Sequence, residues 1–295
     1  MSSRREAFID IRDLRKRFRK VAVLDGITTQ IARGDRIALI GANGAGKTTL
    51  IRCLLGQYVH EGEVRIAGMA PRRHREEVLN KIAFVPQTPP PLRMPVRDLV
   101  NYAAAISGTD TRRIADVAAR LGLDVSEVAA RPFLRLSGGQ KQKLLIAIAM
   151  GRDVDMLIMD EPTANLDPAA RQILFDLLSE RLDKAMIISS HRLEEVAMLV
   201  NRVIEMDRGR IVLDDRVEEA VDPALRLEVK ITLRRPDEAF ANAIAEWGFA
   251  RADKKGLSWK GEVAGPDRLR FLGMLARYSG VITRFSMQER KAGKS

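Results

Sequence analysis

The sequence predicts an α/β fold with a mainly parallel sheet, followed by a small α+β domain. Three observations predict it. Short apolar runs typical of buried parallel strands occur at 156–159 and 185–190. The run at 35–40 leads directly into a glycine-rich loop and then into a helical pattern. From about Leu225 the patterns of strand and helix begin again.

The elements of the first part can be assigned in order. Residues 8–40 indicate two or three short strands, because 7–11 alternates and 35–40 is apolar. A helix is expected from Thr48 until Gly56, which is a plausible C-cap. Further strands are expected at 64–66 and 82–85.

A helical insertion is expected to interrupt the strands. Pro89, Pro90 and Pro91 end the strand pattern, because proline lacks an N–H donor and restricts its predecessor. The stretches 96–122 and 144–150 read as helical, so we place a helical subdomain at about 88–150. An amphipathic helix follows at 168–182.

The C-terminal part reads as a separate small domain. We place a first, larger domain at 1–222 and a small accessory domain at 225–295. Strands are predicted at 227–233, 256–259 and 281–285, and helices at 236–247 and 267–278. This order suggests a ferredoxin-like α+β module.

Composition excludes several classes of protein. The 295 residues are 46% hydrophobic and 30% charged, as in an ordinary globular protein. No stretch approaches 18 uncharged apolar residues, and the first six residues lack the apolar core of a signal peptide. A single cysteine, Cys53, excludes an internal disulfide and fits a reducing cytoplasm.

The net charge of +11 lies mainly in the C-terminal part. Residues 225–295 contain 15 Lys/Arg and 8 Asp/Glu, against 35 and 31 in the rest of the chain. The plain interpretation is a solvated basic face. Anionic lipid headgroups, acidic loops of a partner and nucleic acid are the alternatives. Nucleic acid is the weakest, because the aromatic residues fall at spacings that suit a core.

A phosphate-binding loop occupies 41–48. The pattern Gly-x-x-x-x-Gly-Lys-Thr follows a strand and precedes a helix, which is the context of a P-loop. Its glycines let backbone N–H groups face phosphates. Lys47 is expected at the β- and γ-phosphates, Thr48 on Mg²⁺ and Thr49 at the α-phosphate. The residues expected to bind nucleotide here are Gly41, Asn43, Gly44, Ala45, Gly46, Lys47, Thr48 and Thr49.

Two acidic residues follow the strand at 156–159. A carboxylate at the carboxyl end of a parallel strand lies where such sheets bind ligands. We expect Asp160 to hold Mg²⁺ through water, and Glu161 to act as the general base for the attacking water.

The pentapeptide Leu136-Ser-Gly-Gly-Gln140 carries the most specific signal. Ser137, Gly138, Gly139 and Gln140 open a predicted helix that runs to Met150, and a helix N-terminus binds anions. A second phosphate site in one chain makes sense if it serves another molecule.

With these three motifs together, residues 8–215 resemble the ATP-binding cassette (ABC) ATPases. The resemblance implies a P-loop NTPase core with an N-terminal antiparallel β subdomain and the helical insertion. It also implies that the signature 136–140 completes the ATP site of an opposing cassette in a head-to-tail dimer. ATP and Mg²⁺ are the implied cofactors, and ATP hydrolysis is the implied reaction.

Three further residues and one short loop match the same family. Gln87 matches the glutamine that touches Mg²⁺ and the attacking water, and His191 the histidine that contacts the γ-phosphate. Asn165-Leu-Asp167 matches the loop at the dimer seam, although the family more often has a small residue at the position of Asn165. Phe18 stands where the family usually places a tyrosine that stacks on adenine.

The resemblance also implies partners. A single cassette without a membrane span is expected to serve a separate transmembrane permease, on the cytoplasmic face of the inner membrane as a peripheral subunit. Its closest similarity is to bacterial exporter cassettes, with the segments 89–91 and 95–99 near the permease. The second cassette is expected to be an identical copy or a paralogue, and no nucleic acid is expected. The alternative is a soluble ABC ATPase acting on ribosomes or DNA. The C-terminal domain is interpreted as a ligand sensor or a dimerisation module.

Overall fold

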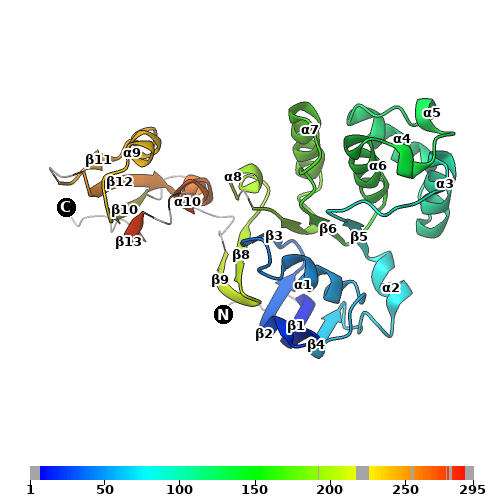
Figure 1. Cartoon of the computed structure of the whole chain (residues 1–295), viewed down its shortest axis with the longest axis horizontal. Helices are drawn as coiled ribbons and strands as arrows, with labels where there is room; N and C mark the ends of the chain where they lie inside the picture. The colour runs from blue at the N-terminus through cyan, green and yellow to red at the C-terminus, as the bar shows by residue number, and fades with distance from the viewer. Residues whose placement is uncertain are drawn as a thin grey trace. The chain divides into compact units, whose positions relative to one another are not determined.

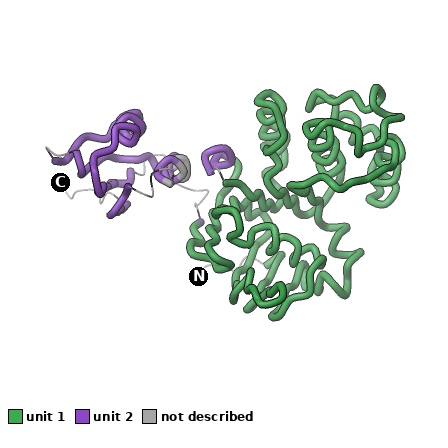
Figure 2. Tube along the Cα trace, in the orientation of Figure 1, with its two compact units in different colours: residues 1–191, 199–215 green, residues 192–198, 216–295 purple. Residues whose placement is uncertain are grey.

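The computed structural model describes residues 7–191, 193–216, 226–253, 256–276, 278 and 281–289. The chain divides into two compact units (Figures 1 and 2). The first contains residues 1–191 and 199–215, and the second contains 192–198 and 216–295. The boundary predicted between residues 222 and 225 lies outside the described residues.

An antiparallel sheet of three strands opens the first unit. Its strands are β1 (Ala7–Phe18), β2 (Val21–Ala32) and β4 (Glu61–Ile66), in the order β2-β1-β4. The alternation read at 7–11 is interrupted, because Phe8 and Ile9 are both buried and the next buried residues are Ile11 and Leu14. The prediction of two or three short strands before Ile40 was therefore wrong in length, since β1 and β2 form one long hairpin whose register shifts several times.

A six-stranded sheet forms the centre of this unit. Its order is β5-β6-β7-β3-β8-β9, and the pairs from β5 to β8 are parallel. All five residues of β6 and of β7 are buried, which is why both sequences are continuous apolar runs. The strands are β3 (Arg36–Ile40), β5 (Ile82–Val85), β6 (Met156–Asp160), β7 (Ala185–Ser189), β8 (Arg202–Asp207) and β9 (Arg210–Arg216).

This strand order brings distant parts of the sequence together. The carboxyl ends of parallel neighbours lie at the same edge of a sheet. β3 leads into the glycine loop, β5 into Gln87, β6 into Glu161 and β7 into His191. The predicted site residues of all four segments therefore share one edge.

Helix α1 (Lys47–Leu54) lies within the main core. Its residues Leu50, Ile51 and Leu54 pack in one cluster with side chains from β1, β2, β3 and β6. Cys53 on the same helix is fully buried, and burial raises the pKa of its thiol to about 11. Packing from both sheets thus fixes the helix that begins at the glycine loop.

The helical insertion is confirmed, with one internal break that was not predicted. Gly108 adopts φ +63° and Asp110 caps the next helix, so the stretch 96–122 forms two helices. A separate apolar core that includes Phe133 and Leu144 holds the insertion together. Its elements are α3 (Val96–Ser107), α4 (Thr111–Arg120), α5 (Val125–Val128), η1 (Phe133–Arg135) and α6 (Gly138–Gly151).

Two further helices belong to the first unit. α2 (Arg75–Asn80) precedes β5 and was not predicted. α7 (Pro168–Ser179) ends three residues before the predicted Leu182, and it begins with Asp167 as its cap and proline in the first turn. Within the described ranges, no helix is both long and apolar enough to cross a membrane.

The second unit has the predicted ferredoxin-like topology. Its sheet order is β11-β12-β10-β13, with antiparallel neighbours throughout. One face of β10 buries Leu227, Val229, Ile231 and Leu233 against a core that contains Phe240 and Phe271. The elements are β10 (Arg226–Leu233), α9 (Glu238–Ala245), β11 (Ala250–Arg251), β12 (Ser258–Ala264), η2 (Gly265–Asp267), α10 (Arg268–Ala276) and β13 (Ile282–Glu289), together with α8 (Leu193–Val196).

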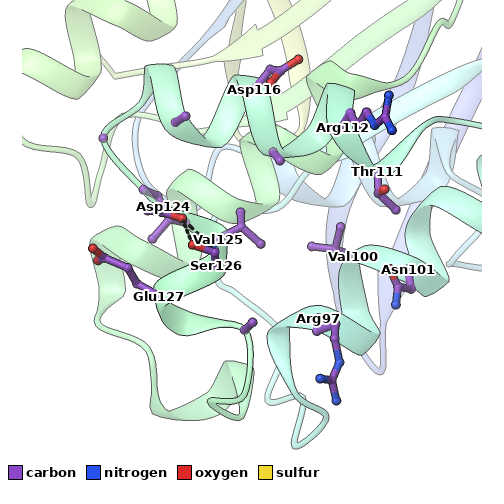
Figure 3. Close-up of a pocket in the computed structure, with 15 residues that line it drawn as sticks. Arg97, Val100, Asn101, Thr111, Arg112, Asp116, Asp124, Val125, Ser126 and Glu127 are labelled. Atoms are coloured by element: carbon purple, nitrogen blue, oxygen red, sulfur yellow. Dashed lines mark hydrogen bonds between the residues drawn. The ribbon is translucent and has the colours of Figure 1, made fainter.

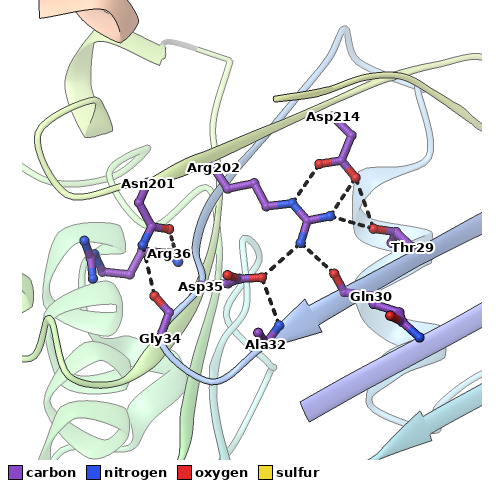
Figure 4. Close-up of polar contacts among 9 residues, drawn as sticks. All are labelled: Thr29, Gln30, Ala32, Gly34, Asp35, Arg36, Asn201, Arg202 and Asp214. Atoms are coloured by element: carbon purple, nitrogen blue, oxygen red, sulfur yellow. Dashed lines mark hydrogen bonds and ion pairs between the residues drawn. The ribbon is translucent and has the colours of Figure 1, made fainter. Parts of the chain in front are cut away.

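A buried arginine ties β2, β8 and β9 together (Figure 4). Arg202 on β8 donates to Asp35 at 3.0 Å and to Asp214 on β9 at 2.6 Å. It also donates to the carbonyl oxygen of Gln30 and to the hydroxyl of Thr29. The side chains of Arg202 and Asp35 are 5% and 1% exposed, so the ion pair between them compensates two charges that are both buried.

Removing this arginine is expected to destabilise the fold. Arg202→Met should lower the free energy of unfolding by about 3 kcal/mol, because the buried carboxylate of Asp35 would lose its ion pair with Arg202. Arg210→Met is the matched control, since Arg210 pairs with Asp25 on the surface and its loss should change stability by less than about 1 kcal/mol. Urea unfolding of both variants measures the difference, and equal losses would contradict the assignment.

Candidate functional site

The loop 41–46 leaves no room for side chains at two of its glycines. A Cβ on Gly41 would lie 2.3 Å from the carbonyl oxygen of Met206. A Cβ on Gly46 would lie 2.9 Å from Leu24 and from the carbonyl oxygen of Val23. Both glycines also have positive φ, +145° and +107°. The backbone is therefore held against β2 and β8 in the turned conformation that a phosphate cradle requires.

Lys47 begins α1 and folds back over this loop. Its Nζ donates to the carbonyl oxygen of Gly41 at 2.6 Å and to that of Ala42 at 3.4 Å. The residue is 6% exposed. The ammonium group thus lies across the concave side of the loop, where a phosphate group would replace the two carbonyls as its partner.

A pocket of about 290 Å³ lies in front of the loop. It brings together the glycine loop, the end of β5 and the end of β6. Its lining residues are Val23, Ala42, Asn43, Gly44, Ala45, Gly46, Lys47, Thr48, Thr49, Gln87 and Glu161. A larger groove lies among α3, α4 and α5 (Figure 3), and its described lining contains none of the predicted site residues.

Asp160 and Glu161 differ sharply in their surroundings. Asp160 is 1% exposed, and its Oδ1 accepts a hydrogen bond of 2.6 Å from the hydroxyl of Ser189. Glu161 adopts φ +46°, which is unfavourable for a residue with a Cβ. This turn takes the chain out of β6, so the two neighbouring carboxylates do not follow the alternation of a strand.

The carboxylate of Glu161 lies next to His191. His191 Nδ1 is 3.3 Å from Glu161 Oε2, and the two side chains are 57% and 11% exposed. One ring nitrogen therefore contacts the carboxylate while most of the ring faces solvent. A histidine at this position can orient the carboxylate of Glu161. His191 is not among the described residues that line the pocket, so its contact with a phosphate group stays a prediction.

The residues present fit ATP with Mg²⁺. Turned backbone amides, Lys47 and the N-terminus of α1 suit a chain of phosphates. Thr48 and Gln87 supply a hydroxyl and an amide oxygen on the pocket wall, and Asp160 supplies a carboxylate at the end of the neighbouring strand. Oxygen donors of this kind are the ligands that Mg²⁺ prefers.

The signature 137–140 lies outside this pocket, at the start of α6. Ser137 and Gln140 form a capping box, with Ser137 Oγ accepting from Gln140 N and Gln140 Oε1 accepting from Ser137 N. The hydroxyl proton of Ser137 and the amides of Gly138 and Gly139 are not used by this capping box and can serve a ligand. Within one described chain, this end of α6 contributes nothing to the pocket lining.

The loop 165–167 is held to α6. Asp167 caps α7 and pairs with Lys143 at 3.0 Å. The amide of Ala170 and the ammonium of Lys143 lower the pKa of the Asp167 carboxyl. A Cβ on Gly139 would lie 3.1 Å from the carbonyl oxygen of Asn165, so this loop and the signature lie side by side.

Phe18 occupies the end of the first hairpin. Its ring packs edge-on against Tyr58 at 5.2 Å, with Lys16 Nζ 4.6 Å from its centroid. The residue is 40% exposed. Phe18 is not among the described residues that line the pocket, whereas Val23 of the same hairpin is. Stacking of adenine on Phe18 remains a prediction.

Two buried polar residues of this region were not predicted. Ser189 contacts both Asp160 and the amide of Glu161. Gln142 on α6 donates to the carbonyl oxygen of Pro162 at 3.2 Å and is 1% exposed. The sequence feature that could have identified both residues is a polar side chain within a segment whose other inward-facing side chains are apolar.

Comparison with known proteins agrees with this geometry. The profile of the ABC transporter family matches residues 24–164. The chain is 33% identical over 224 residues to the aliphatic sulfonates import ATP-binding protein SsuB 1 of Nocardia farcinica, covering 73% of this chain and 86% of that protein. It is 30% identical over 230 residues to the Nod factor export ATP-binding protein I of Rhizobium etli, covering 75% and 72%.

A solved structure described as the ATP binding subunit of an ABC transporter superposes with a TM-score of 0.66 at 25% identity, over 71% of this chain and 90% of that one. The P-loop, the acidic pair 160–161 and the signature helix all lie within the matched segment. The chain therefore belongs to the family of ABC transporter ATP-binding proteins, which are ATPases.

Proposed function

We propose that the chain binds and hydrolyses Mg²⁺–ATP, dimerises head to tail when ATP is bound, and drives a separate transmembrane permease. One observation carries the proposal. The ends of β3, β5, β6 and β7 place a phosphate-type loop, Gln87, Glu161 and His191 around one edge of the sheet. Both relatives named above are ATP-binding components of transport systems, which supports the coupling to transport.

Each residue has a distinct proposed role in hydrolysis. Thr48, Gln87 and Asp160 would hold Mg²⁺, which neutralises phosphate charge when bound. Lys47 would exchange its two carbonyl partners for phosphate oxygens. Glu161 would accept the proton of the attacking water. His191 would orient Glu161 and contact the terminal phosphate.

The dimer is proposed because the chain carries two halves of a phosphate site that do not meet. Ser137 offers a free hydroxyl proton, and the following turn offers amides, but neither lines the pocket of the same chain. A second copy, or a paralogous cassette, placed head to tail would bring that helix end to the open side of the pocket. Two copies would form two equivalent sites.

The outer face of α3 is the proposed contact for the permease. Tyr102 and Ile106 lie one turn apart and are 59% and 60% exposed. They follow the segments 89–91 and 95–99, which connect Gln87 to the helical insertion. An apolar pair near this connection suits a docked segment of a membrane protein. A peripheral position at the cytoplasmic face of the inner membrane follows from this docking.

The direction of transport and the role of the second unit are also proposals. Export was predicted from the sequence, and it stays a prediction because the two named relatives serve one import and one export system. The ferredoxin-like unit is proposed as an accessory, regulatory domain, since its core is separate from the core that supports the ATP site.

Replacing the proposed base should stop turnover and leave binding intact. Glu161→Gln should reduce the rate of ATP hydrolysis at least about 100-fold, because a general base contributes that much or more. Binding of a fluorescent ATP analogue should be unchanged. Glu180→Gln is the control, since Glu180 pairs with Arg120 on the surface. Hydrolysis by Glu161→Gln at the wild-type rate would show that another group is the base.

Charging the outer face of α3 should detach the subunit from its membrane partner. Tyr102→Asp should abolish recovery of a polytopic membrane protein from detergent-solubilised native membranes, while basal ATP hydrolysis and melting temperature stay unchanged. Val212→Asp is the control, because Val212 is equally exposed on β9. If the wild-type chain instead recovered ribosomes or DNA-associated proteins and no membrane protein, the transporter proposal would be wrong. The chain would then act as a soluble ABC ATPase.

A further inference from the structure

We propose that Ser189 is a positioning residue that sets the metal-holding carboxylate and the backbone of the general base together. This inference rests on the proposed roles of Asp160 and Glu161. Ser189 is the last residue of β7 and is fully buried. In the parallel register of β6 and β7 it stands directly beside Asp160.

The hydrogen bonds of Ser189 have only one consistent arrangement. Its Oγ lies 2.6 Å from Asp160 Oδ1 and 2.9 Å from the amide nitrogen of Glu161. An ionised carboxylate only accepts, so the single hydroxyl proton must go to Asp160. The oxygen lone pairs then accept from the Glu161 amide. The buried carboxylate of Asp160 and the amide of Glu161 each thereby gain a partner.

The first of these bonds fixes the carboxylate of Asp160. Because Oδ1 accepts the hydrogen bond from the Ser189 hydroxyl, the carboxylate of Asp160 cannot rotate freely. A short bond to a charged acceptor is among the stronger hydrogen bonds in proteins. Ser189 therefore fixes the orientation of the Asp160 carboxylate in the metal-free protein. This orientation is the one in which Asp160 would contact the water shell of Mg²⁺.

The second bond fixes the turn at Glu161. The amide of Glu161 lies 3.2 Å from the carbonyl oxygen of Ser189 as well as 2.9 Å from its Oγ. This residue has φ +46°, a conformation that needs support from its surroundings. Loss of the hydroxyl would leave the longer bond alone to hold the turn that directs the Glu161 side chain toward His191.

The test compares Ser189→Ala and Ser189→Cys in two measurements. The first is the Mg²⁺ concentration that gives half-maximal binding of a fluorescent ATP analogue, measured in the Glu161→Gln background so that no hydrolysis occurs. Ser189→Ala should raise this concentration roughly tenfold, which is the effect of one hydrogen bond to a charged group. Ser189→Cys keeps a weak donor and should show a smaller increase. Binding in EDTA should be unchanged in both.

The second measurement is turnover at saturating Mg²⁺ in chains that keep Glu161. Ser189→Ala should reduce it roughly tenfold even when Mg²⁺ is saturating, because the base is displaced as well as the metal-holding group. Ile188→Val is the matched control, since it removes a methyl group from the neighbouring buried position on β7. Ile188→Val should lower the melting temperature without changing the Mg²⁺ concentration that gives half-maximal binding (the Mg²⁺ midpoint).

The outcomes separate this inference from the proposed function. The proposed function would be overturned if ATP binding by the wild-type chain did not depend on the Mg²⁺ concentration. It would also be overturned if Glu161→Gln hydrolysed ATP at the wild-type rate. If both behave as proposed and Ser189→Ala has a wild-type midpoint, the role of Ser189 alone is wrong. An equal shift in Ile188→Val would also overturn that role, because the effect would then come from strand packing.

Discussion

The site depends on the close packing of the glycine loop against β2 and β8. A side chain at Gly41 or Gly46 would collide with backbone or core atoms of these strands, so the loop keeps its turned amides whether or not a ligand is present. The same packing fixes the start of α1, and Lys47 with it. The antiparallel sheet thus forms part of the wall that shapes the glycine loop.

The parallel sheet brings the other functional groups to this loop. β7 lies between β3 and β6, so the strand that carries Ser189 is the neighbour of both the loop strand and the strand of Asp160. His191 then follows Ser189 by two residues and contacts Glu161. One strand therefore arranges Asp160, the turn at Glu161 and the histidine that contacts Glu161. The signature helix is organised separately, around the apolar core of the insertion.

The sequence predicts this arrangement well where a motif fixes the local backbone. It predicts less well where the pairing of distant strands determines which side chains meet. The glycine loop, the start of α6 at Gly138 and the ferredoxin-like order follow from local patterns. The role of Ser189 does not, because it requires the register of β6 with β7, which a single sequence does not contain. The length of the first hairpin was missed for a similar reason, since its register shifts break the alternation. The break at Gly108 shows that alanine-rich propensity does not reveal where a helix ends.

The most direct test of the proposed dimeric site is cross-linking between its two halves. Asn43→Cys and Ser137→Cys would be placed in separate Glu161→Gln chains, mixed, and treated with a short thiol cross-linker. Both positions are exposed, whereas native Cys53 is buried with its pKa raised to about 11. A head-to-tail dimer predicts a product of two chains that forms only in the mixture and only with Mg²⁺–ATP. An unlinked mixture with ATP bound, or a cross-link within one chain carrying both cysteines, would contradict it.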